Sequence, residues 1–319
     1  ESQQNTPESI NAEEISVWHR GKVSIELNLP DKHSFDKLFG KIREADVLIY
    51  DHHANHYADC DLSYTSLAKD NPGLVCVSLP GFPKGHIYED LPPDEGIVAA
   101  ASGIYSFNPS GEQPIEGEGP SFHALPYAST FAAITASTAV VAALFHRVKH
   151  NTGQQITVPV HDAMEQGMGS ALVRHSKRSH GNQEGHPVIK RFYRCKDDRW
   201  INVNISMPRF LRPFLENIDH IDWLEPLTNS KALLADELSR NQWINQFTEI
   251  WLGKTAIQWE NTMADLGIPG TMCRSIDEWL DSEHSVAAGT TITVEDPVIG
   301  EMKQPGKIVR LSNQIENIS

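Results

Sequence analysis

The sequence predicts an α/β protein: an open, parallel, Rossmann-like sheet with helices, joined to a smaller α+β domain. Three observations support this fold class. Leu125–Met168 reads as a helix, a glycine turn, a short β-branched strand and a second helix. The apolar runs Ala45–Tyr50 and Pro72–Leu79 have the length and composition of buried parallel strands. The polar segment His175–Pro187 then indicates a domain boundary.

We therefore expect a large α/β domain over residues 1–190, a small α+β domain over residues 191–290, and a segment over residues 291–319 that returns to pack on the large domain. A chain of 319 residues can bury one large core or two modest ones. Its net charge of −15 argues against nucleic acid and acidic membrane surfaces as partners. Four widely spaced cysteines without a CxxC pair indicate free thiols and a cytoplasmic location.

The central helix carries no charged residue from Leu125 to Phe145. That length could span a bilayer, but five hydroxyl side chains make a poor lipid-facing surface. We therefore predict a helix that is buried on nearly every side within the protein and has no membrane role. Asn151 and Gly153 supply the signal that ends it.

The elements before the central helix follow from local patterns. Ser34–Glu44 has the apolar spacing of an amphipathic helix, with Ser34 as its predicted N-cap. The strand Ala45–Tyr50 follows it, and a helix over Tyr64–Asp70 leads into the strand Pro72–Leu79. Residues 106–124, rich in Gly, Pro, Ser and Glu, are expected to form a loop.

Beyond the polar segment, the pattern is typical of a small mixed domain. Arg191–Ile205 predicts two strands, and residues 290–311 predict a closing hairpin. Trp243, Phe247 and Trp251 share one helical stripe, which indicates a core position. Helices are predicted at Pro208–Ile218, Lys231–Ser239, Gln242–Leu252, Ala256–Leu266 and Ile276–Ser282.

The segment Asp51–Cys60 gathers three histidines, two carboxylates and a thiol, which are metal-ligand side chains. Its spacing argues against a metal site, because His52 and His53 are adjacent and face different ways on any regular element. No HExxH or equivalent helical pair is present. We therefore expect a polar loop after a strand, and no bound metal.

The order of several short motifs over roughly residues 18–312 resembles the class III CoA-transferases, the family of formyl-CoA transferase, carnitine CoA-transferase and α-methylacyl-CoA racemase. Pro126-Tyr127-Ala128-Ser129 stands at the place of the family's P-x-A-D segment. The remaining central matches are Ala142, Ala143, Leu144, Thr152, Gly153, Gln155, Asp162 and Ala163. The resemblance also implies that a first βαβ unit of the family is missing, as in a truncated chain.

The resemblance places the family's catalytic aspartate at Ser129. In the family, that carboxylate attacks an acyl-CoA thioester, forms a mixed anhydride and exchanges the acyl group with coenzyme A. A serine cannot form an anhydride, so Ser129 departs from the family's mechanism. A serine nucleophile would also need a base, for which the nearest sequence offers only the distant His123. Alternatively, Ser129 caps or packs the helix.

The coenzyme A contact loops of the family correspond to positions that include Asp51, His52, Asp59, Gly81 and Phe82. Asp59 stands where family members carry an arginine for a coenzyme A phosphate, so the site loses a charge-assisted contact and gains repulsion. We therefore expect weak coenzyme A binding by this chain alone. A coenzyme A thioester is the expected substrate if the chain is active.

Another helix motif of the family matches residues 94–103. Glu95 takes the place of a family aspartate there, and Asp94 takes the place of the catalytic histidine of the racemase branch. The resemblance therefore implies no racemase activity.

These departures predict a degenerate, non-catalytic half of a CoA-transferase assembly that acts on an acyl-CoA and a small carboxylic acid. Its partner would be a second copy in an interlocked homodimer, or a paired active CoA-transferase domain. An active acyl-CoA-processing enzyme that uses Ser129 or water is the alternative, and a ligand- or metal-binding module is a third.

Overall fold

The computed structural model of this chain describes residues 12–28, 31–51, 62–106, 125–172, 186–228, 236–297, 299–307 and 309. The chain divides into two compact units. One comprises residues 1–25 and 185–319, and the other comprises residues 26–184. The N-terminal segment thus groups with the C-terminal half, whereas the sequence placed it in the large domain. The packing of residues 291–319 on that domain remains a prediction.

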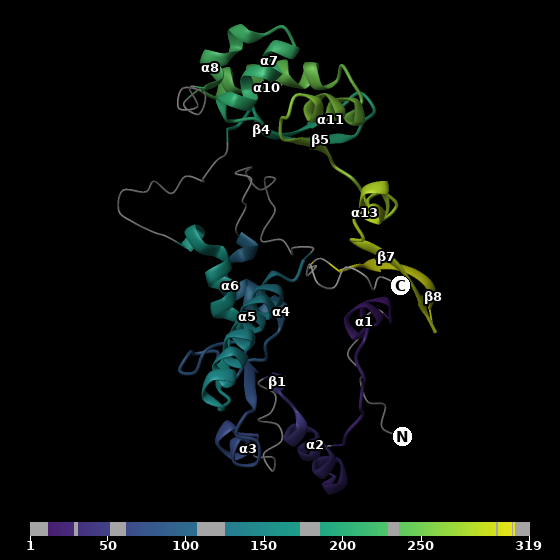
Figure 1. The fold of residues 1–319 in the computed structure, drawn as a ribbon. Helices are drawn as coiled ribbons and strands as arrows, with labels where there is room; N and C mark the ends of the chain where they lie inside the picture. Colours follow the sequence, from purple (N-terminus) through teal and green to yellow (C-terminus); the bar gives the residue numbers. More distant parts are fainter. Residues whose placement is uncertain are drawn as a thin grey trace, which may run out of the picture. The chain divides into compact units, whose positions relative to one another are not determined.

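The unit of residues 26–184 contains a three-stranded parallel sheet in the order β1-β2-β3. Its elements are α2 (Lys32–Glu44), β1 (Val47–Asp51), α3 (Tyr64–Asp70), β2 (Val75–Leu79), α4 (Glu95–Ser102), η2 (Ile104–Ser106), α5 (Tyr127–His150), β3 (Gln155–Thr157), α6 (Val160–Met168) and η3 (Gly169–Leu172). The parallel sheet with helices confirms the predicted α/β class. Figure 1 shows helices α4, α5 and α6 gathered beside the strands.

Strand β2 lies at the centre of this sheet and is its most buried strand. Val75 pairs with Val47 of β1, and Cys76 pairs with Gln155 of β3. Val75, Cys76 and Val77 are fully buried. A strand that is covered by neighbours and by helices on its faces needs apolar side chains on both sides. This explains why its sequence reads as an uninterrupted apolar run.

Helix α5 packs on α4 and α6 through a stripe of small side chains. The buried residues of the helix are Ala128, Ala132, Ala136 and Ala143. The prediction that α5 is buried on nearly every side is wrong for the described part of the chain, because α4 and α6 cover one face only. On the opposite face Val141 is 67% exposed and Phe145 is 62% exposed.

By length and composition, α5 is also the one helix among the described residues that could cross a membrane. Its alanine stripe is packed against protein, but only 22% of its apolar 18-residue window is buried. The absence of a membrane role therefore remains the prediction that the sequence made.

Helix α5 ends where the sequence predicted. Asn151 adopts the left-handed conformation with φ of 55°, and its N–H group donates to the carbonyl of Arg147. Gly153 follows, and its N–H group donates to the carbonyl of Pro72 at 2.8 Å. A side chain at this glycine would collide with the backbone carbonyl of Leu74. Because Gly153 has no side chain, the turn can pack closely against the start of β2.

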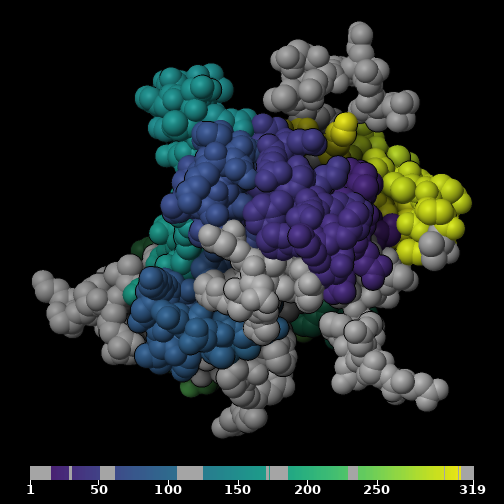
Figure 2. Space-filling model, turned by 90° about the horizontal axis from the view of Figure 1, so that it is seen from below, coloured from purple at the N-terminus to yellow at the C-terminus, as the bar shows by residue number. Residues whose placement is uncertain are grey.

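Helix α2 begins earlier than predicted. Asp31 is its N-cap and accepts the N–H group of Ser34, so the prediction that Ser34 caps the helix is wrong. An aspartate is as good an N-cap as a serine, and it stands one turn earlier. Helices α2 and α3 lie side by side, and Figure 2 shows their segments, in purple and blue, as adjacent parts of one surface.

The unit of residues 1–25 and 185–319 contains an antiparallel sheet, β4-β5-β6, and a separate hairpin, β7-β8. Its elements are α1 (Ala12–His19), β4 (Lys190–Arg194), β5 (Trp200–Asn204), α7 (Pro208–Asn217), η4 (Ile221–Trp223), α8 (Leu224–Thr228), α10 (Glu237–Trp251), α11 (Ala256–Asp265), β6 (Gly270–Met272), α12 (Ile276–Leu280), α13 (Glu283–Ala287), β7 (Thr291–Asp296) and β8 (Gly300–Pro305). Helices and an antiparallel sheet confirm the predicted α+β character.

The core of this unit confirms the predicted aromatic stripe of α10. Phe247 and Trp251 are fully buried, and Trp243 packs against the same cluster. The ring of Phe214 on α7 stacks on Trp251 at a centroid distance of 5.1 Å. The two helices predicted over 231–252 differ from the structure, because α10 continues through the gap between them.

Helix α1 is hydrogen-bonded to the β7–β8 hairpin, which lies near the other end of the sequence. Ser16 donates to Asp296 at 2.6 Å, and Arg20 donates to the fully buried Gln304 at 2.9 Å. These bonds join the first described helix to strands β7 and β8. They explain why residues 1–25 group with residues 185–319 in one unit.

Candidate functional site

The candidate site is the N-terminal end of helix α5. The other end of this helix adjoins the start of β2, where Arg147 donates to the carbonyl of Gly73 at 3.1 Å. Because α5 leads into β3 parallel to β2, its N-terminus lies toward the carboxyl ends of the strands. Open α/β sheets bind their ligands at that edge.

The first turn of α5 lacks a cap from its own segment. Pro126 occupies the N-cap position and contributes no side-chain hydrogen bond. The first N–H groups of a helix need acceptors, and a carboxylate is favoured there by the helix dipole. Such a carboxylate has to come from another element.

Glu95, the first residue of α4, supplies it. Its Oε1 accepts the N–H group of Ala128 at 3.0 Å, and its Oε2 accepts the N–H group of Ser129 at 2.8 Å. The hydroxyl of Ser129 also donates to Oε2, at 2.6 Å. One carboxylate therefore accepts three hydrogen bonds and caps a helix to which it does not belong.

Ser129 is the third residue of α5 and not its N-cap, so the proposed capping role for this serine is wrong in its geometry. Its side chain is tied to Glu95 instead. The sequence suggested His123 as the nearest base, but that residue lies outside the described part of the chain. The signal for Glu95 was present in the resemblance, because positions 95 and 129 both depart from the family pattern.

Asp94 is a second acidic residue beside Glu95. Asp94 is the N-cap of α4, and its Oδ1 accepts the N–H group of Ile97 at 3.0 Å. Burial raises the pKa of Tyr105, and the negative charges of Glu95 and Asp94 raise it further. The two carboxylates thus form a negatively charged corner beside the start of α5.

Gly81 and Phe82 follow β2 at its carboxyl end. The carbonyl of Gly81 accepts the N–H group of His161 at 3.0 Å, so this turn holds the start of α6. A side chain at Gly81 would lie 2.8 Å from the carbonyl oxygen of Pro92. The close approach at this glycine is therefore made by the chain's own backbone. A contact with coenzyme A remains a prediction.

Phe82 is buried inside a group of rings. Its ring stacks on His86 at a centroid distance of 5.1 Å, and the rings of Tyr88 and His161 lie at 5.4 and 5.2 Å. This cluster fixes the plane of the His161 imidazole. The sequence had singled out Phe82 but not these partners.

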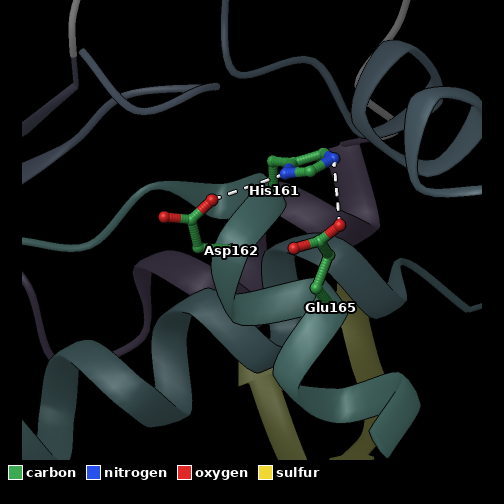
Figure 3. Close-up of side chains that lie close together, drawn as sticks. All are labelled: His161, Asp162 and Glu165. Atoms are coloured by element: carbon green, nitrogen blue, oxygen red, sulfur yellow. Dashed lines mark hydrogen bonds and ion pairs between the residues drawn. The ribbon is translucent and has the colours of Figure 1, made fainter. Parts of the chain in front are cut away.

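His161, Asp162 and Glu165 form the one group among the described residues that could hold a metal ion, with donor atoms within 4.8 Å of one another. Asp162 Oδ1 lies 3.4 Å from Nδ1 of the imidazole, and Glu165 Oε1 lies 3.8 Å from Nε2. The carboxylates thus lie at different nitrogens of one ring (Figure 3). A single ion could bind only one of those nitrogens, so the donor set fits a metal poorly.

The remaining predicted positions cannot be placed in this site. His52 and Asp59 lie outside the described residues, as does most of the histidine-rich segment. Asp51 ends strand β1, where its backbone pairs with Leu79 of β2. Its place at the carboxyl end of a parallel strand agrees with the edge at which the resemblance puts a contact loop.

Solved structures with the same fold support this description. Rv3272 from Mycobacterium tuberculosis has a TM-score of 0.76 at 17% identity, over 92% of this chain and 78% of that one. A CAIB/BAIF family protein from Brucella suis has a TM-score of 0.68 at 18% identity, over 92% and 76%. This chain therefore has the same α/β fold as these two proteins.

The sequence comparison identifies the family. Residues 4–318 match CoA-transferase family III, and this chain belongs to that family. The resemblance recognised from short motifs is thus confirmed.

Two characterised relatives cover most of the chain. The CoA-transferase/lyase DddD of Marinomonas sp. (strain MWYL1) is 28% identical over 94% of this chain but only 41% of its own length. The succinyl-CoA–L-malate CoA-transferase alpha subunit of Chloroflexus aurantiacus is 24% identical over 92% of this chain and 68% of its own. The chain thus spans about two fifths of the first relative.

Proposed function

We propose that this chain is a non-catalytic half of a CoA-transferase assembly that acts on an acyl-CoA and a small carboxylic acid. One observation carries the proposal. At the position that the resemblance gives to the catalytic aspartate, the side chain is a hydroxyl, and its proton is donated to Glu95 at 2.6 Å. A hydroxyl cannot form the mixed anhydride through which a carboxylate exchanges acyl groups.

The relatives support the wider assembly. DddD is named a CoA-transferase/lyase and is more than twice as long as the matched region, and the Chloroflexus relative is named an alpha subunit. We infer that the partner is either an active CoA-transferase domain, which would supply the missing carboxylate, or a second copy in an interlocked homodimer. The substrates would be a coenzyme A thioester and a small acid, in the cytoplasm.

A second candidate function also has a specific observation in its favour. Ser129 has a carboxylate acceptor within hydrogen-bond distance, which is the arrangement of a nucleophile and a base. The hydroxyl oxygen of Ser129 would then attack the thioester carbonyl and form an ester, Glu95 would take the hydroxyl proton, and the C–S bond would break to release coenzyme A as a thiolate. Against this, both oxygens of Glu95 are already shared with the backbone of α5, so the carboxylate is held in a capping role.

Intact-mass spectrometry of the chain incubated with succinyl-CoA separates the two candidates. The proposal predicts no acyl adduct on Ser129. The matched control is Ser137→Ala, which removes another α5 hydroxyl, one that donates to the carbonyl of Ala133. An adduct that Ser129→Ala abolishes and Ser137→Ala keeps would overturn the proposal and establish Ser129 as a nucleophile.

The assembly offers a second test. Ser129→Ala in the complete assembly should leave the rate of acyl exchange between succinyl-CoA and L-malate unchanged. It should lower the free energy of unfolding of this chain by about 1 kcal/mol, because one solvent-exposed hydrogen bond is lost. Loss of exchange with unchanged stability would contradict the non-catalytic assignment.

A further inference from the structure

The face of helix α5 opposite its alanine stripe carries exposed apolar side chains at a regular spacing. Four of them are between 59% and 83% exposed: Ile134, Val141, Phe145 and Val148. Together with Thr138 they follow one another at alternating steps of four and three residues. That spacing is the a/d pattern of a coiled-coil seam. We call these five residues the α5 seam.

The hydroxyl groups on this side of the helix are already hydrogen-bonded. Ser137 donates to the carbonyl of Ala133 at 2.7 Å, and Thr138 donates to the carbonyl of Ile134 at 2.9 Å. Both acceptors belong to α5 itself, so a partner that covered the seam would leave neither hydroxyl without an acceptor. The seam can therefore be buried against protein without a polar penalty from these two residues.

We propose that the α5 seam pairs with the same seam of a second copy of this chain, with the two helices antiparallel. A two-fold pair of this kind buries one surface of both copies. When each layer of the seam joins an a position to a d position, Ile134 meets the partner's Phe145, and Thr138 meets the partner's Val141. This register is centred close to the middle of α5, so the two helices overlap over nearly their whole length.

Charges at the two ends of α5 favour the antiparallel arrangement. The last turn of the helix is basic, and its first turn is capped by the carboxylate of Glu95. Lys149 lies on the seam side, because its Nζ is 4.4 Å from the centre of the Phe145 ring. The register sets Lys149 opposite the partner's Thr130, next to the residue that binds Glu95. A parallel pair would instead bring the two Lys149 side chains together and align the two helix dipoles.

The second copy would thus contribute a residue to the candidate site. The corner formed by Asp94 and Glu95 is negatively charged, and the partner's Lys149 supplies a positive charge beside it. A chain cannot do this with its own Lys149, because α5 has 24 residues and is about 36 Å long. The proposal rests on the proposed function in its choice of partner, since it selects the second copy over an active domain.

A bilayer is the other apolar environment that this face could meet. Helix α6 packs along α5, and the side chains of its Asp162 and Glu165 are roughly half exposed. If α5 crossed a membrane, these carboxylates would enter the hydrocarbon with it, where charged groups are costly. The contacts of α5 therefore favour a protein partner.

Sedimentation equilibrium of the full chain over a concentration series tests the pairing. We expect a dimer whose dissociation constant Val141→Glu raises about 30-fold or more, because it puts a charge at the centre of the seam. The matched control is Ile276→Glu, which adds the same charge at an exposed apolar residue of α12 and should leave the dimer unchanged. Circular dichroism confirms that each variant is folded.

Lys149→Glu tests the charge at the end of the seam. It should weaken the dimer about tenfold at low salt, and the effect should shrink at high salt because ions screen the pair. Lys69→Glu makes the same charge change on α3 and should have no effect. Equal effects of the two variants would show that only the net charge matters, and would overturn the assignment of Lys149 to the partner's site.

Crosslinking tests the register. Chains with Ile134→Cys and chains with Phe145→Cys, carrying different tags and lacking Cys60 and Cys273, are mixed and treated with a short bismaleimide. An antiparallel pair should crosslink one kind of chain to the other. Two Ile134→Cys chains should not crosslink, because their cysteines would lie about 16 Å apart along the seam. A crosslink between two Ile134→Cys chains alone would indicate a parallel pair and overturn the proposal.

Three further results would overturn it. These are a chain that stays monomeric at every concentration, a dimer that Val141→Glu leaves intact, and a natural chain that pellets with phosphatidylcholine vesicles through Val141. None of the measurements uses an acyl-CoA. A monomeric chain without an acyl adduct on Ser129 would therefore overturn the pairing and leave the non-catalytic assignment standing.

Discussion

Glu260 and Arg274 form a doubly hydrogen-bonded ion pair that joins helix α11 to the segment after strand β6. The hydroxyl of Thr271 and the N–H group of Met272 also donate to the same carboxylate, each at 2.7 Å. The side chains of Glu260 and Arg274 are only 19% and 26% exposed. Four hydrogen-bond donors therefore converge on one partly buried carboxylate.

The stability of the small domain should therefore depend on Glu260 and on pH. The Arg274 guanidinium lowers the pKa of Glu260 from 4.5 to about 2. Because the folded-state value lies below the unfolded one, the stabilisation is complete above pH 4.5 and is lost as the pH falls toward 2. Glu260→Gln should lower the free energy of unfolding by about 2 kcal/mol near neutral pH. Chemical denaturation should show this deficit shrinking in acid.

The control for this prediction is Asp198→Asn, which removes the exposed pair between Arg194 and Asp198. Such surface pairs contribute little, so its effect should stay below about 0.5 kcal/mol at any pH. Equal losses for the two variants would show that burial and the additional donors do not matter.

Gly153→Ala should destabilise the unit of residues 26–184. The added methyl group would collide with the carbonyl of Leu74, at the point where the α5–β3 turn crosses the start of β2. We expect a loss of about 1–3 kcal/mol in the free energy of unfolding. Gly40→Ala is the matched control, because nothing lies within 4 Å of its added atom and it stands inside helix α2. That change should stabilise the chain by about 0.5–1 kcal/mol, and a loss there would contradict the argument.

Two buried tryptophans of the small domain offer a matched measurement of one hydrogen bond. The indole N–H of Trp259 donates to the carbonyl of Trp251 at 2.9 Å, whereas the indole N–H of Trp251 is buried without a partner among the described residues. Trp259→Phe should therefore cost about 1 kcal/mol more in unfolding free energy than Trp251→Phe. Equal costs in urea unfolding would show that this hydrogen bond contributes nothing.

Coenzyme A should bind this chain weakly, because the resemblance to the family places Asp59 at the position of a phosphate-binding arginine. A lost charge-assisted contact costs roughly 1.5–3 kcal/mol, or about 10–150-fold in affinity. Titration calorimetry with coenzyme A should show Asp59→Arg recovering part of this factor. Asp61→Arg introduces the same charge two residues away and should recover less. Micromolar binding by the natural chain would contradict the prediction.

The sequence by itself determined the local elements and, through their order, the family. The apolar run of β2, the stop at Asn151 and Gly153, and the aromatic stripe of α10 depend on residues close together in the chain, and the structure confirms them. Such signals are readable because strand and helix periods place neighbouring residues on one face.

Only the tertiary structure decided what surrounds the candidate site. The acceptor of the Ser129 hydroxyl is Glu95, and the rings around Phe82 come from residues as distant as His161. It also decided that α5 buries one stripe and leaves Val141 exposed, although its composition predicted burial all round. The composition of a helix determines whether it can be buried. The elements that pack against the helix determine which of its faces is buried. Contacts of this kind join segments that lie far apart in the chain, and no local sequence pattern specifies which distant residues will make them.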